Sequence, residues 1–397
     1  MNNIQNVEIY LDYATIPSLN YFLHFAENYQ DTTTIRLFGL GRFTIPQTII
    51  DRYPAGIIRF CEAKAGDQTQ FEQLFTELLE QSTQPLNLCF HLNLFHSQQM
   101  FLPLHHLIQG YRTKIANVSL HFYDDGAEGV AKLNDLSEKP KYLADQLAQQ
   151  QLKGQNIIIS DYSIFRYQWG MIYPTTYHLL NTDILTQNAL LPLKEYLKNH
   201  SLIDFSRFQK LSKLQQDIIL EIIGLIRENV EKLIKASYQY AFFIFIGSAI
   251  FDDDKQRLIE FERLHFNLLE QYLFPTGKFY IGQEYVACYK GHPHSSQINE
   301  KIKEHYQGKL IYLPDNIPLE VLLLLGLDVK LIGGFASTIH FQFSSEKIAD
   351  LIFMTTNNYQ LNKTNDLYQT QLNFLNVMIK LGYTIADKTH YFTEFNS

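Results

Sequence analysis

Short apolar runs alternate with longer amphipathic segments over the first 125 residues of the chain. Runs without polar alternation fit strands buried on both faces, whereas apolar residues three or four apart, as from Phe71 to Leu79, fit helices with one buried face. Glycine and proline punctuate the segments. This pattern predicts strands at 7–11, 34–38, 56–60, 86–94 and 118–123, and helices at 17–27, from 46 onward, at 71–80 and at 98–108.

The same rhythm resumes after residue 240, following a mainly helical stretch whose longest helix is predicted at 211–236. Strands are predicted there at 242–246, 285–289, 310–313 and 329–332, and helices at 256–272, 297–306 and 318–325. Strands that alternate with helices favour a parallel sheet covered on both faces. We therefore expect an α/β protein with two Rossmann-like domains that face each other across a cleft.

We place the first domain at 1–155 and the second at 156–377. The tail of about 378–397 is expected to pack back on the first domain. The polar, helix-prone segment 134–155 is the expected crossing between the domains.

Composition narrows the class of protein. The 397 residues are 46% hydrophobic and carry a formal net charge of −8, with no block of Lys or Arg. Nucleic-acid binding is therefore disfavoured. The longest apolar stretch, 240–251, is too short for a membrane span, and the N-terminus lacks a signal-peptide pattern. Three widely separated cysteines predict free thiols in a reducing compartment. We expect a cytoplasmic protein without an integral membrane segment; contact with the inner face of the membrane stays open.

Candidate chemistry lies at the ends of predicted strands. Asp125, in the sequence YDDG, can act as a general base, or it can belong to an ordinary Asp-Gly turn. Lys290 and His292, in the sequence KGHP, precede a predicted helix, and a helix N-terminus with a nearby cation attracts anions. A surface turn is the plain alternative for this stretch.

Two further features fit an anionic ligand that carries a ribose. The sequence GGFAST ends in Ser337 and Thr338, which can hold a phosphate with backbone N–H and hydroxyl groups, or can simply form a tight turn. Glu320 lies in the first turn of a predicted helix, where it can accept hydrogen bonds from a ribose diol or complement the helix dipole.

Histidines do not indicate a metal centre. His91, His96, His105 and His106 lack the convergent spacing and acidic partner that metal ligation needs, and His292 and His294 lack a third ligand. We expect no metal and no cofactor. His96, just after a strand, is the histidine expected at the cleft.

Taken together, these stretches resemble the bacterial sialyltransferases of glycosyltransferase family 80. The resemblance runs nearly end to end and is specific in its YDDG, KGHP and paired-hydroxyl signatures. It rests on YLDYATIPSLN at 10–20, FGLGRFTIP at 38–46, HLNLFHS at 91–97, YDDG at 123–126, YHLLNTD at 177–183, PLKEYL at 192–197, YKGHP at 289–293, LEVL at 319–322 and GGFAST at 333–338.

The resemblance implies a GT-B fold, CMP-sialic acid as the donor substrate, and metal-independent inversion at the anomeric carbon with Asp125 as the general base. It implies that His292 contacts the leaving phosphate and that a glycan or glycolipid, such as a galactoside or a lipooligosaccharide, is the acceptor. The remaining implied contacts are Lys290, Gly291, Pro293, Glu320, Ser337, Thr338 and Gly247 for the donor, and Arg42, His96, Ala14, Thr15, Ala127 and Phe251 for the sialic acid and acceptor.

The sequence departs from the family pattern on the acceptor side. Ala127 stands where the family often has a serine, and Phe251 where several members have a tryptophan. Three alternatives stay open: transfer of another CMP-activated ulosonic acid such as Kdo, hydrolysis of CMP-sialic acid, or binding of it with weak transfer. The sequence does not distinguish an α2,3 from an α2,6 linkage.

Overall fold

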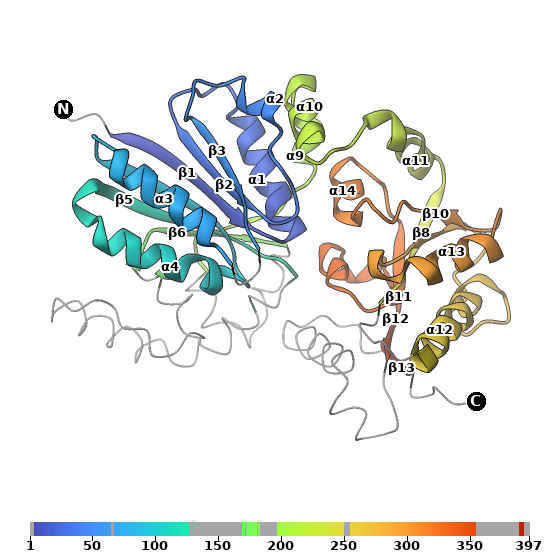
Figure 1. Cartoon of the computed structure of the whole chain (residues 1–397). Coiled ribbons are helices and arrows are strands. Elements are labelled where there is room, and N and C mark those ends of the chain that lie inside the picture. Colours follow the sequence, from blue (N-terminus) through green and yellow to red (C-terminus); the bar gives the residue numbers. More distant parts are fainter. Residues whose placement is uncertain are drawn as a thin grey trace, which may run out of the picture. The chain divides into compact units, whose positions relative to one another are not determined.

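The chain divides into two compact α/β units, Met1–Arg227 and Glu228–Ser397 (Figure 1). This division comes from a computed structural model, which describes residues 4–64, 67–126, 130, 169–170, 172–180, 182, 197–249, 255–354 and 389–392. None of the helices in these ranges combines the length and the apolar character that a membrane span requires.

A parallel seven-stranded sheet forms the centre of the first unit, in the strand order β3-β2-β1-β4-β5-β6-β7. Its strands are β1 (Gln5–Asp12), β2 (Ile35–Leu40), β3 (Ile58–Glu62), β4 (Leu86–Asn93), β5 (Ile115–Tyr123), β6 (Thr175–Leu179) and β7 (His200–Leu202). Its helices are α1 (Thr15–Glu27), α2 (Gln47–Ile50), α3 (Thr69–Gln81), α4 (Ser97–Gly110), α9 (Arg207–Lys210) and α10 (Lys213–Ile222), with a 3₁₀ turn at Arg112–Lys114.

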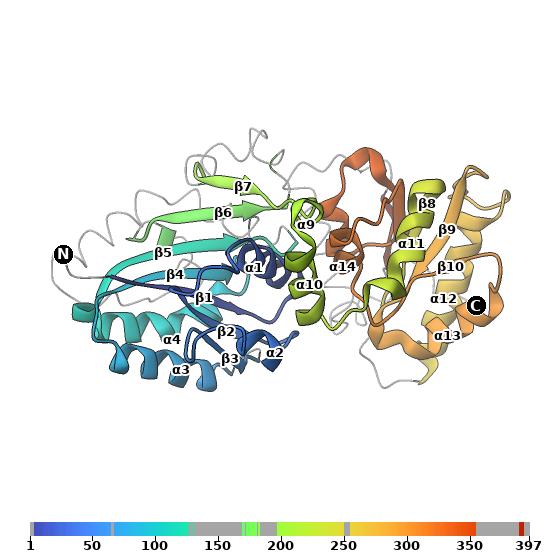
Figure 2. The ribbon, with the colours of Figure 1, turned by 90° about the horizontal axis from the view of Figure 1, so that it is seen from above.

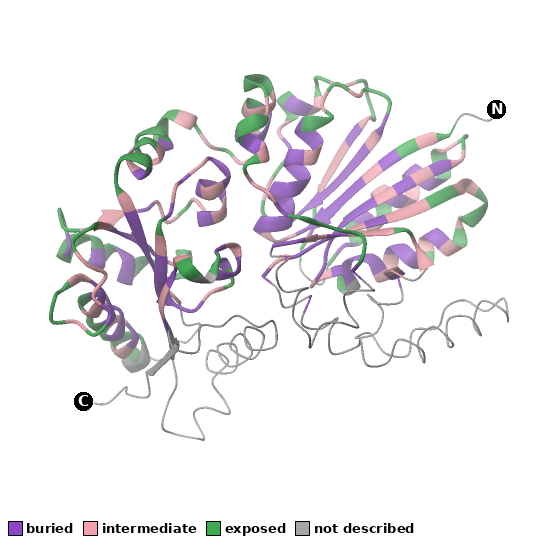
Figure 3. Ribbon diagram, turned by 180° about the vertical axis from the view of Figure 1, so that it is seen from behind, coloured by how far each residue is buried: buried purple, intermediate pink, exposed green. Residues whose placement is uncertain are grey.

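Helices cover both faces of this sheet. The chain first runs outward from β1 to β3 and then returns to β4 and β5, so right-handed crossovers place the helices of the two halves on opposite faces. Helices α3 and α4 pack side by side on one face, while α10 packs against α1 (Figures 1 and 2). The central strands of the sheet, which lie between the helices on its two faces, are largely buried (Figure 3).

A parallel six-stranded sheet forms the second unit, in the order β10-β9-β8-β11-β12-β13. Its strands are β8 (Ala241–Ile246), β9 (Tyr285–Lys290), β10 (Ile311–Tyr312), β11 (Leu331–Phe335), β12 (Ile348–Met354) and β13 (Thr389–Phe392). Its helices are α11 (Arg227–Gln239), α12 (Lys255–Leu273), α13 (Ser296–His305) and α14 (Leu319–Leu324), with 3₁₀ turns at Pro293–Ser295, Thr338–Gln342 and Ser345–Lys347. Phe243, Phe245, Tyr272 and Phe335 are fully buried in its core.

Both sheets share one topology, because each begins at an inner strand, runs to one edge and then returns to build the other side. The order reverses between β1 and β4 in the first unit and between β8 and β11 in the second. Parallel sheets bind ligands beyond the carboxyl ends of the strands at such reversal points. The functional residues should therefore lie in the loops after these strands.

The elements predicted from the apolar pattern are confirmed with shifts of a few residues, but three expectations differ from the structure. The helix predicted at 211–236 is two helices, because α10 ends at Ile222 and the chain turns at Gly224, whose φ of +66° favours glycine. Strands β6 and β7 were not predicted; they continue the first sheet, so the units divide after Arg227 and not at 155/156.

The tail is the third difference. β13 pairs with β12 of the second sheet, whereas the tail 378–397 was expected on the first domain. The rest of that tail and the expected crossing at 134–155 lie outside the described residues.

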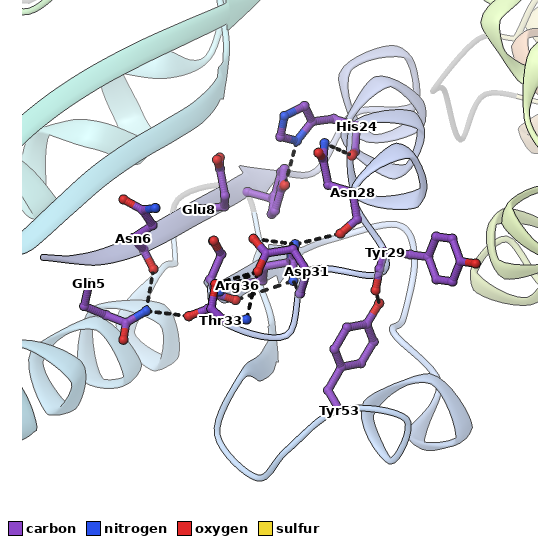
Figure 4. A network of polar contacts seen from close by, with 12 residues as sticks. Gln5, Asn6, Glu8, His24, Asn28, Tyr29, Asp31, Thr33, Arg36 and Tyr53 are labelled. Atoms are coloured by element: carbon purple, nitrogen blue, oxygen red, sulfur yellow. Dashed lines mark hydrogen bonds and ion pairs between the residues drawn. The ribbon is translucent and has the colours of Figure 1, made fainter. Parts of the chain in front are cut away.

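A buried arginine on β2 joins this strand of the first sheet to the end of α1. Arg36, on β2, is 1% exposed, and its guanidinium donates to the carbonyl of Asn28 at the end of α1 (2.9 Å) and to that of Asp31 (2.7 Å). Its guanidinium carbon also lies 5.6 Å from the ring centre of Phe25. A cation suits this place because the last carbonyls of a helix carry partial negative charge. Figure 4 shows this network around the α1–β2 loop.

We predict that Arg36→Met destabilises the protein by about 2 to 3 kcal/mol, because two partly buried carbonyls lose a charged donor. Arg59→Met is the matched control: Arg59, on β3, makes only long contacts of 3.4 Å at the surface, so its loss should cost no more than about 0.5 kcal/mol. Chemical denaturation followed by circular dichroism measures both. Equal losses of stability in the two variants would contradict the role given to Arg36.

Candidate functional site

Three polar side chains meet at the carboxyl ends of neighbouring strands in the first unit. Asp12 ends β1, Asn93 ends β4, and Asp125 follows β5 by two residues. These strands are adjacent in the order β1-β4-β5. Asp12 and Asn93 are fully buried, whereas Asp125 is only half-buried and so can reach a ligand.

The amide of Asn93 has a single possible orientation. Its Oδ1 accepts the backbone N–H groups of Phe95 (2.7 Å) and His96 (3.0 Å), so this atom must be the oxygen. The Nδ2 group then donates to the carboxylates of Asp125 (3.2 Å) and Asp12 (3.4 Å). One amide therefore positions the carboxylate of Asp125 against a buried second carboxylate.

Asp12 anchors the start of α1. Its Oδ1 accepts the backbone N–H groups of Tyr13 (2.7 Å) and Ala14 (2.8 Å), and its Oδ2 accepts the hydroxyl of Tyr21 (3.2 Å). Burial raises the pKa of Asp12 to about 7, although these hydrogen bonds oppose the shift. A buried carboxyl held on all sides is a positioning group, because no side remains for a substrate.

The two aspartates of the YDDG sequence have different surroundings. Asp124 is 1% exposed, its backbone N–H donates to the carbonyl of His178, and its carboxylate accepts the N–H of Leu180 at 3.4 Å. It thus joins β5 to β6. Asp125 is more exposed, and Gly126 after it has a φ of +116°, which favours glycine. Asp125 is therefore the member of the pair that is available to a substrate.

The other residues expected in the first unit surround these strand ends. His96 precedes α4, and its ring centre lies 4.6 Å from that of Tyr13. Ala14 and Thr15 begin α1, where Thr15 is buried. Arg42 is exposed after β2 and follows Gly41, whose N–H donates to the carbonyl of Asp12 at 2.9 Å. Ala127 and Phe251 lie outside the described residues.

In the second unit, glycines bring two strand ends close together. A Cβ on Gly247, after β8, would lie 2.6 Å from the hydroxyl of Tyr289. A Cβ on Gly291, after β9, would lie 2.3 Å from the Oδ1 of Asn299. Both distances are too short for any side chain. The buried amide of Asn299 accepts the hydroxyl of Tyr289 (3.1 Å) and donates to the carbonyl of His292 (2.9 Å), so the loop of His292 is firmly held.

Lys290 has a structural role that the sequence did not reveal. It is 7% exposed, and its Nζ donates to the carbonyls of Pro314 (2.9 Å), Asp315 (3.2 Å) and Gly291 (3.4 Å). The ammonium group thus joins the loops after β9 and β10. Its positive charge still favours an anion nearby, but the hydrogen bonds of Lys290 show that it stabilises these two loops.

The ring of His292 has a defined tautomer. Its Nδ1 accepts the backbone N–H of His294 at 3.2 Å, so the neutral ring carries its proton on Nε2. The residue is half-buried and is followed by the exposed Pro293. An Nε2–H group is a suitable donor to a phosphate oxygen.

The loop after β11 contributes hydroxyl groups at the same edge of the sheet, because β8 lies between β9 and β11. Gly334 has a φ of +92°, and a Cβ there would lie 2.7 Å from the carbonyl oxygen of Ile246. Ser337 is half-buried and Thr338 exposed, and the N–H of Ser337 donates to His340 (3.2 Å). Glu320 is half-buried in the first turn of α14, as expected.

Sequence reasoning missed a row of histidines across the first sheet. His91, His121 and His178 stack with ring centres 4.9 and 5.2 Å apart, and His24 of α1 lies 4.7 Å from His91. Burial lowers the pKa of each; those of His24 and His178 fall to about 3. The lowered pKa values keep these rings neutral near pH 7. Among the described residues, Glu8, Cys89 and His91 also bring three ligand atoms close enough to hold a metal ion.

Comparisons with known proteins identify the family. Residues 7–385 match the family model described as Sialyltransferase PMO188. No curated protein sequence gave a significant match.

Solved structures share the fold. The GT-B domain of a sialyltransferase from Photobacterium damselae has a TM-score of 0.79 at 22% identity, covering 97% of this chain and 99% of that chain. A 2,6-sialyltransferase from Photobacterium sp. JT-ISH-224 was solved with the donor product CMP and the acceptor substrate lactose. It has a TM-score of 0.74 at 22% identity, covering 97% of this chain and 78% of that chain. An α/β-galactoside α-2,3-sialyltransferase from Photobacterium phosphoreum has a TM-score of 0.73 at 20% identity, covering 98% of each chain.

The likeness shows that the two sheets form a GT-B fold, as expected. The family match, which extends over nearly the whole chain, gives the class of enzyme: the chain belongs to the sialyltransferase family of glycosyltransferases.

Proposed function

We propose that this enzyme transfers sialic acid from CMP-sialic acid to a hydroxyl of a galactoside, with inversion at the anomeric carbon. Asp125 takes the proton of the acceptor hydroxyl, whose oxygen then forms the bond to the anomeric carbon. The bond from that carbon to the phosphate oxygen breaks, and its electron pair leaves with CMP. No metal ion takes part in this transfer. The observation that carries the proposal is the fixed amide of Asn93, which presents the carboxylate of Asp125 at a strand end.

The surroundings of Asp125 suit a general base. The N–H of Asn93 stabilises its charged form, which is the form that accepts a proton. Partial exposure leaves the carboxylate accessible to a hydroxyl group. An inverting transfer needs one such base and a stabilised leaving group, and it forms no covalent intermediate with the protein.

The second unit suits the leaving group. His292 directs an Nε2–H donor from a loop held by Asn299, and Ser337 and Thr338 add hydroxyl groups from the loop after β11. Donors fixed before the reaction stabilise the negative charge that grows on the phosphate. In this proposal Glu320 binds the ribose, while Gly247, Gly291 and Pro293 let the nucleotide approach the backbone closely.

The acceptor and the location extend the proposal. A galactoside is chosen because the similar Photobacterium enzymes use lactose or galactosides; a lipooligosaccharide that ends in galactose carries the same hydroxyl groups. Arg42, His96, Ala14 and Thr15 surround the strand ends where this sugar and the sialic acid would bind. The three cysteines are free thiols, which favours the reducing cytoplasm as the place of action.

We predict that Asp125→Asn lowers the rate of transfer from CMP-sialic acid to lactose by about 100-fold or more, because the amide cannot accept the proton. The affinity for CMP, measured by calorimetry, should change little. Asp51→Asn, at an exposed carboxylate beyond α2, is the control and should retain full activity. Near-normal turnover in the Asp125 variant would remove this residue from its assigned role.

His292→Ala should weaken CMP binding and lower the transfer rate, each by about tenfold, because the phosphate loses a hydrogen-bond donor. The neighbouring His294→Ala serves as the control, since the hydrogen bond to His292 comes from the backbone N–H of His294, which alanine keeps. Calorimetry with CMP and initial rates with lactose give the two quantities. If both variants behaved alike, the ring of His292 would have no special part in donor binding.

A further inference from the structure

Three possible metal ligands converge on the first sheet. Glu8 on β1 lies directly opposite Cys89 on β4 in the strand register, and His91 is two residues further along β4 on the same face. The Oε2 of Glu8 lies 2.6 Å from the Nε2 of His91, and the Sγ of Cys89 lies 3.7 Å from that nitrogen. All three ligand atoms lie within 4.8 Å of one another.

These distances are close to those of a tetrahedral zinc site. Metal bonds of about 2.0 Å to nitrogen and oxygen and about 2.3 Å to sulfur place the ligand atoms about 3.3 to 3.7 Å apart. The sulfur-to-nitrogen distance already has this value. The hydrogen bond between Glu8 and His91 must open by less than about 1 Å to admit an ion. The long side chain of Glu8, at the surface end of the group, can make that movement.

The set also has a suitable composition and charge. A carboxylate, a thiolate and a neutral imidazole are ligands that Zn²⁺ accepts, and the first two together balance a charge of +2. The thiol of Cys89 loses its proton when the metal binds. The nearest buried cation on β2 is Arg36, which lies opposite Glu8 in the register, but its guanidinium is bonded to the carbonyls of Asn28 and Asp31 (Figure 4).

The rest of the site is held firmly and is open on one side. The Nδ1 of His91 lies 3.0 Å from the hydroxyl of Tyr123 on β5, the kind of contact that orients a metal-bound histidine. His91 is 1% exposed, whereas the side chain of Glu8 is 23% exposed, so an ion can enter beside Glu8 and keep a water molecule as its fourth ligand.

We propose that Glu8, Cys89 and His91 bind a borderline-soft divalent cation of the Zn²⁺ type and so link β1 to β4. The site is separate from the proposed transfer step, which uses no metal, and the inference does not depend on the proposed function. The sequence did not reveal it because only strand pairing brings Glu8 to residues more than 80 positions away.

A cobalt titration of the metal-free chain 1–397 tests the proposal, because Co²⁺ takes the place of Zn²⁺ and reports its ligands by colour. The wild type should bind one Co²⁺ with a thiolate-to-cobalt charge-transfer band and the strong visible bands of a four-coordinate ion, and Zn²⁺ should abolish both. Absence of the charge-transfer band from the wild type would overturn the proposal.

Three variants identify the ligands. Cys89→Ser should lose the band, whereas Cys61→Ser, at the half-buried cysteine of β3, should keep it. Glu8→Gln retains a hydrogen-bond acceptor for His91 but removes the charge, and should weaken Co²⁺ binding at least tenfold. Circular dichroism confirms that each variant folds. A band that persists in Cys89→Ser, or unchanged affinity in Glu8→Gln, would contradict the assignment.

Discussion

The amide of Asn93 can be placed in only one way, and the candidate site of the first unit depends on it. Two N–H groups from the turn after β4 fix its oxygen, so its nitrogen must serve the carboxylates of Asp125 and Asp12. The amide thus holds Asp125, the proposed base, through a neutral donor. A cation there would hold the carboxylate more strongly but would make it a weaker base.

The second unit has the same topology, but its strand-end loops must leave room for a ligand. There the strand order reverses between β8 and β11, and the loops after β8, β9 and β11 leave little side-chain volume at the reversal. Gly247 and Gly291 are needed because Tyr289 and Asn299 occupy the space where a Cβ would lie. The buried polar groups beneath these glycines, together with the ammonium of Lys290, hold the loop that carries His292. Glycines that leave space for a ligand, supported by the hydrogen bonds of Asn299, suit a site that accepts a nucleotide phosphate.

Much of the fold and many candidate residues could be predicted from local sequence. The strand at 285–289 is an apolar run without polar alternation, and His292 follows it at a turn marked by glycine. Asp125 likewise follows the predicted strand 118–123 and precedes a glycine. Local pattern did not reveal the short polar strand β6, or the break at Gly224 within a continuing helical periodicity. These features depend on pairing with β5 and on backbone conformation, which apolar spacing does not encode.

Contacts between residues far apart in the chain also could not be predicted from the sequence. Asn93 looks like the end of a buried strand until its partners, 32 and 81 residues away, are placed beside it. The sequence indicated that Lys290 supplies a positive charge for an anionic ligand. In the structure its ammonium group donates to carbonyls of the loop after β10. The group of Glu8, Cys89 and His91 likewise exists only through the register of β1 with β4.

The pH dependence of transfer in Asn93→Ala tests the central claim most directly, with Asn87→Ala, at a surface position on the same strand, as the control. Without the N–H of Asn93, Asp125 is no longer held in place, so the rate near neutral pH should fall about tenfold. The charged form of Asp125 is also less stable, so the acid limb of the rate profile should move to higher pH. The control should follow the wild type. An unchanged rate together with an unchanged acid limb in Asn93→Ala would show that Asn93 does not hold the base.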